Sequence, residues 1–540
     1  MGGLSVVDVL VDIPKTFRSL SYFAGDDPLH VGDEVVVPYG SREARGLVVG
    51  EGSLDKATRH VAQKLGNRFN GFDVTALADI AHQHMVDPLL LWRRVGPTNR
   101  PLTPTVLSPT PPKSVRLPQP DNVTNPTGGK LGRYLICPPN LELLTETVLW
   151  VVSRLATGAP VAGCQTRPGS VLVLCPTKTW VEALVGASGG VIANHTTPGV
   201  WEHFTNGTLP IVAGTRAAGW WSPPMLAGIV LVDDSHVGHR EQRNPLTHSR
   251  QIAAARTKTN KATMVTVTSN VTAAGMLPGL KVVRVAPRSR WPHTKIVDRN
   301  NEPPETKTVP TVVQSLVATA LTKGDRPVVV TPHHQTVLRC THCYTPAVEP
   351  NKQCATCGQK NQKRFGITPE TISKCFPAKT RVIDRAGLGR LRNPASLTVL
   401  LDIDPYLYRA TLTPATDLAG LYNLAAQKTQ PGGTLVFVTT QPEHNLLQHF
   451  IARDPLAAAK TIWEEAKTAG LPPFKQKTVL HFQRKTRPNL SELCGTVYGP
   501  KQTGPNSWEA TILHDKTDIL QTQPALGNLI KRGNVYLQID

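Results

Sequence analysis

The chain has 540 residues, of which 40% are hydrophobic and 18% charged, and this ordinary globular balance excludes a chain that is mostly disordered. One hydrophobic core rarely serves so many residues, so we expect several domains. Lys and Arg number 59 against 39 Asp and Glu, which gives a formal net charge of +20. A field of this sign favours polyanions such as nucleic acid, although a generically basic protein would carry the same excess.

The sequence shows no export or membrane signal. The first residues lack a basic stretch, and Asp8 and Asp12 interrupt the apolar residues that follow. Position 6 is Val, so the N-myristoylation pattern fails, and no segment offers ~18 uninterrupted apolar residues. Nine cysteines, four of them with metal-type spacing, indicate a reducing compartment. We therefore expect a cytoplasmic protein with no membrane partner.

The first 96 residues predict a small β-domain followed by a helix. Short apolar runs separated by turn residues predict strands over 6–11, 33–38 and 45–49, and the stretch 74–95 has a helical pattern. Nine prolines between 97 and 126 exclude a regular helix or a central strand, so residues 97–130 are predicted to be a linker.

The rest of the chain alternates between strand and helix patterns, which predicts α/β layers. We predict one unit over residues 131–286 and another over 311–470. The Pro-containing stretch 287–310 between them is predicted to be a second linker, and residues 471–540 a C-terminal domain. The predicted elements are strands at 171–175, 211–213, 229–232, 264–267, 327–330, 397–401, 434–438, 478–482 and 534–539, and a helix at 457–469.

Four cysteines have the spacing of a structural zinc site: Cys340, Cys343, Cys354 and Cys357. Two residues between paired thiolates let one tight turn direct both sulfurs at one ion, and two such turns complete a tetrahedron with no open position. We predict one zinc ion in a clip at 338–360, with redox thiols as the alternative. The remaining cysteines, predicted to be small core residues, are Cys137, Cys164, Cys175, Cys375 and Cys494.

Several motifs in a fixed order carry a family resemblance. They are Val9–Phe17, Gly32–Gly40, Gly46–Gly50, Val212–Arg216, Ile229–His236, Asn244–Arg250, the cysteine clip, Gly366–Glu370 and Leu471–Phe474. In this order the chain resembles the PriA family of primosomal replication-restart helicases (primosomal protein N′), and more closely its shortened, degenerate actinobacterial form. The resemblance covers nearly the whole chain, with gaps.

The resemblance implies a multidomain α/β fold. It would have an N-terminal β-domain like the one that holds a DNA 3′ end, two degenerate RecA-like helicase lobes, a zinc-binding insertion with one ion where active members have two, and a C-terminal α+β domain. The implied function is replication restart and primosome assembly. The implied partners are forked or single-stranded DNA, single-stranded-DNA-binding protein, and the replicative helicase or its loader, with the protein at the nucleoid.

The resemblance also suggests DNA-contacting residues. Phe17 and Tyr22 would line a base-stacking pocket, with core aromatics as the alternative. Arg216 and Arg250 lie beside the Ile229–His236 box, with Arg240 and Arg243 nearby, and Lys363 and Arg364 follow the clip. Cationic side chains of this kind contact phosphates and give salt-dependent binding. For Trp220 and Trp221, a stacking platform and core packing remain alternatives.

The parts that hydrolyse ATP are missing. Pro138, Pro139 and Asn140 stand where a Gly-rich loop with Lys and Ser/Thr would cradle phosphates. Asp233 and Asp234 form a vestigial nucleotide and Mg²⁺ box or, alternatively, face solvent at a strand end. Residues 421–428 contain no arginine finger. Phosphoryl transfer depends on positioning and charge, so we predict a non-hydrolysing DNA-binding protein. An active ATP-dependent 3′–5′ helicase and a zinc-ribbon nucleic-acid-binding factor are the alternatives.

Overall fold

A computed structural model describes most of the chain between residues 5 and 539. The residues outside the description are 1–4, 14–18, 68, 85, 95–132, 138, 140, 162–165, 243–245, 273–280, 285–290, 304–305, 307–308, 333–334, 344–352, 355, 361, 409–413, 484, 492–494, 516–534 and 540. The predicted linker at 97–130 lies wholly outside the described residues. None of the helices in the described part is both long and apolar enough to cross a membrane.

The N-terminal unit is a five-stranded antiparallel sheet with strand order β2-β1-β4-β3-β5. Alternating valines on β1 and β3 bury one face in a small core that includes Val7, Val9, Val35 and Val48. The strands are β1 (Val6–Val11), β2 (Leu20–Phe23), β3 (Asp33–Tyr39), β4 (Arg42–Glu51) and β5 (Gln63–Asn67), with the short helix η1 (Leu54–Lys56) before β5.

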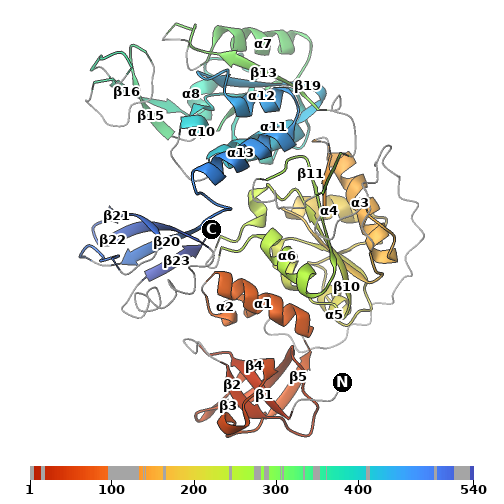
Figure 1. Cartoon of the computed structure of the whole chain (residues 1–540). Helices are drawn as coiled ribbons and strands as arrows, with labels where there is room; N and C mark the ends of the chain where they lie inside the picture. The colour runs from red at the N-terminus through yellow and green to blue at the C-terminus, as the bar shows by residue number, and fades with distance from the viewer. Residues whose placement is uncertain are drawn as a thin grey trace.

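Two helices, α1 (Gly71–Gln83) and α2 (Pro88–Trp92), lie between this sheet and the next unit (Figure 1). Asn70 and Asp87 cap their N-termini through side-chain hydrogen bonds, which is why the chain turns helical there. Leu77 of α1 packs in one apolar cluster with Leu47 of the sheet and Ile252 of the next unit. The helices therefore join the two units through a shared core.

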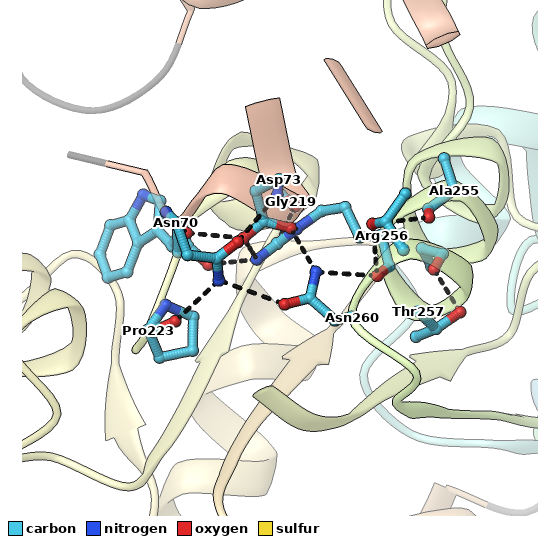
Figure 2. Close-up of polar contacts among 12 residues, drawn as sticks. Asn70, Asp73, Gly219, Pro223, Ala255, Arg256, Thr257 and Asn260 are labelled. Carbon is cyan, nitrogen blue, oxygen red and sulfur yellow. Dashed lines mark hydrogen bonds and ion pairs between the residues drawn. The ribbon is translucent and has the colours of Figure 1, made fainter. Parts of the chain in front are cut away.

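A fully buried ion pair strengthens this junction (Figure 2). Asp73 of α1 accepts hydrogen bonds from Arg256 Nε at 2.8 Å and Nη2 at 2.9 Å, and neither side chain is exposed. Ser222 and Asn260 donate to the same carboxylate at 2.6 and 2.9 Å. Arg256 also donates to the carbonyl oxygen of Trp221 at 2.8 Å. Since the charges are both paired and hydrogen-bonded, their burial is tolerated.

The first α/β unit spans residues 133–284 and contains a seven-stranded parallel sheet. Its strand order is β12-β6-β11-β10-β7-β9-β8, with helices on both faces (Figure 1). The elements are β6 (Arg133–Ile136), α3 (Leu141–Thr157), β7 (Ser170–Leu174), α4 (Lys178–Ala187), β8 (Ala193–Asn194), α5 (Val200–Thr205), β9 (Ile211–Gly214), η2 (Arg216–Trp220), β10 (Leu226–Val232), η3 (Val237–His239), α6 (Ser249–Thr259), β11 (Thr263–Thr268) and β12 (Lys281–Arg284).

The second α/β unit spans residues 291–468 around a five-stranded parallel sheet with order β13-β19-β18-β14-β17. Its elements are β13 (His293–Asp298), α7 (Thr311–Thr322), β14 (Val328–Thr331), α8 (Pro369–Ser373), β17 (Arg381–Asp384), α9 (Arg385–Gly389), β18 (Ala395–Leu400), α10 (Asp404–Tyr408), α11 (Pro414–Gln427), β19 (Thr429–Thr439), α12 (Asn445–Ile451) and α13 (Pro455–Thr468). Strand β13 lies inside the stretch predicted as a linker, because its backbone pairs with β19 as a sheet edge.

Two smaller sheets complete the described chain. The hairpin of β15 (Gln335–Cys340) and β16 (Gln362–Ile367) projects from the second α/β unit (Figure 1). The C-terminal sheet is antiparallel, with order β21-β22-β20-β23, formed by β20 (Gln476–Gln483), β21 (Thr496–Gly504), β22 (Ser507–His514) and β23 (Val535–Ile539). Gln476 of this sheet donates to the carbonyl oxygen of Gln83 at 2.7 Å, so α1 contacts the C-terminal sheet as well.

The sequence predictions of strands and of the 457–469 helix are confirmed to within a few residues, and the fold is a mixed α/β architecture with parallel sheets. Cys137 and Cys175 are buried, as predicted for core residues. The same prediction is wrong for Cys375, which is exposed because it follows the short helix α8 at the surface. Cys164 and Cys494 lie outside the described residues.

Candidate functional site

The four predicted cysteines meet at the end of the β15–β16 hairpin. Their sulfur atoms all lie within 4.8 Å of one another. Cys340 and Cys357 are 3.5 Å apart, and Cys343 and Cys354 are 3.4 Å apart, far longer than the ~2.0 Å of a disulfide. Four thiolates at ~2.3 Å from a tetrahedral Zn²⁺ would be roughly 3.8 Å apart. The arrangement therefore fits a single metal ion.

Two of these thiols have pKa values shifted in opposite directions. Backbone N–H groups of Cys357 and Thr356 donate to Cys354 and lower the pKa of that thiol to about 6. At Cys357, a hydrogen bond from Gln359 N lowers the pKa, but burial and the neighbouring sulfurs outweigh it and raise the pKa to about 12. A divalent cation held by these cysteines would favour their thiolate forms, because its charge deprotonates the thiols that coordinate it.

A buried charge network fastens the hairpin to the second α/β unit. Arg339, the residue before Cys340, donates through Nη2 to Asp402, and both side chains are almost fully buried. Arg299 donates to the other oxygen of Asp402 at 2.6 Å and also to Asp404. Burial alone would raise the pKa of Asp402, but the charges of Arg299 and Arg339 outweigh it and lower the pKa. These ion pairs therefore connect the cysteine clip to the ends of β13 and β18 in the second α/β unit.

At the place expected for a phosphate cradle, a short connection joins strand β6 to helix α3. Strand β6 ends at Ile136 and α3 begins at Leu141, so four residues join them, whereas the Gly-rich phosphate loop takes about eight. The backbone N–H of Cys137 donates to Thr268 O at 2.9 Å, so this N–H pairs with the neighbouring strand and cannot donate to a phosphate. The Cys137 thiol is completely buried near Thr147, and burial raises its pKa to about 12. Pro139 has no N–H to offer, and Pro138 and Asn140 lie outside the described residues.

Asp233, directly after β10, contacts the second α/β unit. Its carboxylate accepts from Asn423 Nδ2 at 2.9 Å and from Gln427 Nε2 at 3.1 Å, both on α11, and from Ser235 Oγ at 2.9 Å. Asp233 is 2% exposed and adopts a left-handed backbone with φ 52°. The solvent-facing alternative is therefore wrong for Asp233, because two amides of the other unit enclose it.

Asp234 points to a different partner. Its Oδ2 accepts from Arg250 Nη1 at 2.9 Å and from Thr272 Oγ1 at 3.2 Å, and the residue is 1% exposed. The solvent-facing alternative is wrong here too, because α6 and the end of β11 cover the carboxylate. Arg250, which was predicted to contact DNA, forms an ion pair with Asp234 inside the first α/β unit.

Apolar packing reinforces the contact between the two α/β units. Ile136 at the end of β6 and Val271 after β11 belong to the same hydrophobic cluster as Leu421 and Tyr422 of α11. All four side chains are at most 2% exposed. Helix α11 therefore packs over residues at the ends of β6 and β11 of the first unit.

The other predicted residues have varied environments. Tyr22 is 4% exposed in the core of the N-terminal sheet and donates to Pro38 O at 3.1 Å, which agrees with the core alternative, and Phe17 lies outside the described residues. Arg216 is half-buried and pairs with Glu241 at 3.3 Å. Lys363 is exposed on β16. The described side chains do not include Arg364 or Arg243; Arg240 is exposed, and Trp220 and Trp221 are buried in cores.

Comparison with known proteins supports the resemblance. No family model matches the chain. The curated Replication restart protein PriA of Haemophilus influenzae is 23% identical over 368 residues, which cover 55% of this chain and 50% of that protein. The match thus spans about half the length of the curated relative. Among solved structures, one described as the structure of PRRSV helicase aligns with 81% of this chain and 68% of its own, with a TM-score of 0.25 and 8% identity.

The fold and the site together define a multi-sheet α/β protein whose four clustered cysteines could hold a metal ion. The chain is distantly similar to PriA, in agreement with the resemblance that its motifs carry. Asn423 and Gln427 were missed as site residues. Their spacing of four residues places both amides on one helix face, but only the tertiary position of α11 next to Asp233 directs that face at the carboxylate.

Proposed function

We propose that this chain is a replication-restart protein that binds forked or single-stranded DNA and helps reload the replisome without hydrolysing ATP. The observation that carries the proposal is the enclosed carboxylate of Asp233, which accepts hydrogen bonds from Asn423 and Gln427, together with the four-residue connection between β6 and α3. A nucleotide-binding cleft needs phosphate-binding amides and a carboxylate free to hold Mg²⁺. Neither requirement is met by the described residues around β6 and β10.

The PriA relative and the net charge of +20 support the DNA-binding part of the proposal. The division into a 3′-end-binding-like N-terminal domain, two degenerate RecA-like lobes and a C-terminal domain belongs to the same proposal. So do one structural zinc ion in the cysteine clip, a cytoplasmic location at the nucleoid, and single-stranded-DNA-binding protein and the replicative helicase or its loader as partners.

The test uses purified full-length chain with labelled forked DNA. We expect binding that weakens steeply as salt rises, and ATP hydrolysis that stays at background with or without DNA. DNA-stimulated hydrolysis that disappears in Asp233→Asn would instead establish an active helicase. Equal affinity for forked DNA, linear duplex and RNA at one salt concentration would favour the zinc-ribbon alternative.

A further inference from the structure

Exposed cations gather at one edge of the sheet in the second α/β unit. Strands β17, β14 and β18 are parallel neighbours, so their amino ends lie at the same edge. The segments that lead into these strands are 323–327, 379–380 and 390–394. The cations of these segments and of the first position of β17 are all exposed, and we call them the basic edge: Lys323, Arg326, Lys379, Arg381, Arg390 and Arg392.

The strand register brings cations of different segments side by side. Val328 of β14 pairs with Arg381 of β17. Arg326 and Lys379 each come two residues before this pair, so they approach the sheet edge as neighbours. Adjacent strands lie about 4.8 Å apart, so three strands spread the basic edge over roughly 10 Å. One strand of a DNA duplex carries a phosphate about every 3.4 Å along the helix axis, so the edge can face several phosphates at once.

The charges of the basic edge are not neutralised within the described part of the chain. None of its six cations forms an ion pair with a described residue, and the segments that contain them include a single acid, Asp325. Arg250, Arg256 and Arg299, in contrast, all pair with carboxylates. The edge is therefore a strongly positive surface that solvent can reach.

Helix capping and edge protection account for only part of this surface. Lys323 and Arg390 are the C-cap residues of α7 and α9, where a cation suits the helix dipole. Arg381 lies on the edge strand β17, where a charge discourages pairing with another chain. Arg326 and Lys379 have neither role, because they lie in the loops before β14 and β17 and cap no helix. Their charges therefore point to an anionic partner.

We propose that the basic edge binds the phosphate backbone of a DNA double strand, such as one duplex arm of a fork. The inference rests on the proposed DNA-binding function and assigns part of it to this surface. Sites for single strands combine cations with aromatic side chains that stack on bases. The segments 323–327, 379–381 and 390–394 contain no aromatic residue, so this edge offers charge alone. Contacts of that kind suit a duplex, whose phosphates lie outside and whose bases are already stacked.

The first arm of the test removes charge from the basic edge. Binding of a labelled blunt duplex is measured by fluorescence anisotropy over a range of salt for the full-length protein and for the double variant Arg326→Gln with Lys379→Gln. Each lost phosphate contact should lower the slope of log K against log salt by about 0.9. Two lost contacts should therefore weaken binding about 60-fold at 0.1 M salt. The variant Arg326→Lys with Lys379→Arg keeps both charges and should bind like the parent.

The matched control removes the same charge elsewhere. Lys258 on α6 and Lys295 on β13 are exposed, and β13 is the opposite edge of the sheet from β17. Screening over about 10 Å at 0.1 M salt confines the effect of a distant charge, so Lys258→Gln with Lys295→Gln should stay within about twofold of the parent. The second arm repeats the titrations with an oligothymidylate of equal length, and we expect the Arg326 and Lys379 substitutions to weaken duplex binding far more than single-strand binding.

The outcomes separate the two proposals. If the unaltered protein binds neither forked nor single-stranded DNA, the proposed function itself is lost. If the unaltered protein binds forked DNA but Arg326→Gln with Lys379→Gln binds the duplex like the control, the duplex site is refuted and the DNA-binding function stands. An equal loss on duplex and oligothymidylate would likewise overturn the assignment of this edge to a double strand.

Discussion

Replacing Asn423 by leucine tests whether the two α/β units are held together through Asp233. Leucine has a similar size, so the change removes the amide donor without opening a large cavity. Asn423 and Asp233 are each 2% exposed, and their hydrogen bond of 2.9 Å crosses from α11 to the end of β10. The carboxylate of Asp233 then keeps Ser235 and Gln427 as donors.

The expected cost follows from the charge and burial of the acceptor. A hydrogen bond to a buried charged group is worth about 1.5–3 kcal/mol, because the charge cannot recover water as a partner. We therefore expect the free energy that holds the units together to fall by about 2 kcal/mol, which raises the open population roughly 30-fold. The apolar contacts of Ile136 and Val271 with α11 should limit the loss to this value.

Native-state hydrogen exchange of α11 and of the segment after β10 measures this opening. The matched control is Gln430→Leu, which removes an exposed amide that donates to Pro394 O, also in the second unit, at 3.4 Å. Protection should fall at the contact in Asn423→Leu and stay unchanged in the control. A change below about 0.5 kcal/mol would refute the view that this hydrogen bond holds the units together.

Three other predictions concern the junction, the metal site and pH. Asp73→Ala should destabilise α1 by about 3–5 kcal/mol, because the charge of Arg256 stays buried without its partner; hydrogen exchange of α1 measures it, and protection equal to the parent's would contradict it. Elemental analysis should find one zinc ion per chain. The substitution Cys354→Ser or a chelator should remove the ion and make the cysteine clip sensitive to protease. A metal-free chain whose clip resists protease would contradict the metal site. Burial lowers the pKa of His239 to about 4 in the folded chain. As pH falls, the unfolded chain therefore protonates this histidine before the folded chain does. The stability that comes from neutral His239 is complete above about pH 6.5 and is lost as the pH falls to about 4. Denaturation from pH 7 to 4 should show up to about 3 kcal/mol of this loss, and His239→Asn should flatten that part of the curve.

Local chemistry explains why some features were predictable. The two Cys-x2-Cys turns bring pairs of sulfurs together whatever the rest of the fold does, so the spacing alone predicted the cluster of Cys340, Cys343, Cys354 and Cys357. Buried strands appear as short runs of β-branched residues, so the parallel sheets were also predictable. The sequence could also be searched for a phosphate cradle, because that cradle is a continuous motif, and Pro138, Pro139 and Asn140 lack its Gly, Lys and Ser/Thr.

The sequence by itself thus determined the four clustered cysteines that could hold a metal ion, the α/β character and the positive charge. Only the tertiary structure decided that Asp233 is enclosed by Asn423 and Gln427 and that Asp73 pairs with Arg256. The physical reason is distance along the chain. Asp73 and Arg256 are 183 residues apart, and Asp233 and Asn423 are 190 apart. Such pairs depend on which helix faces pack together, and no local pattern encodes that choice.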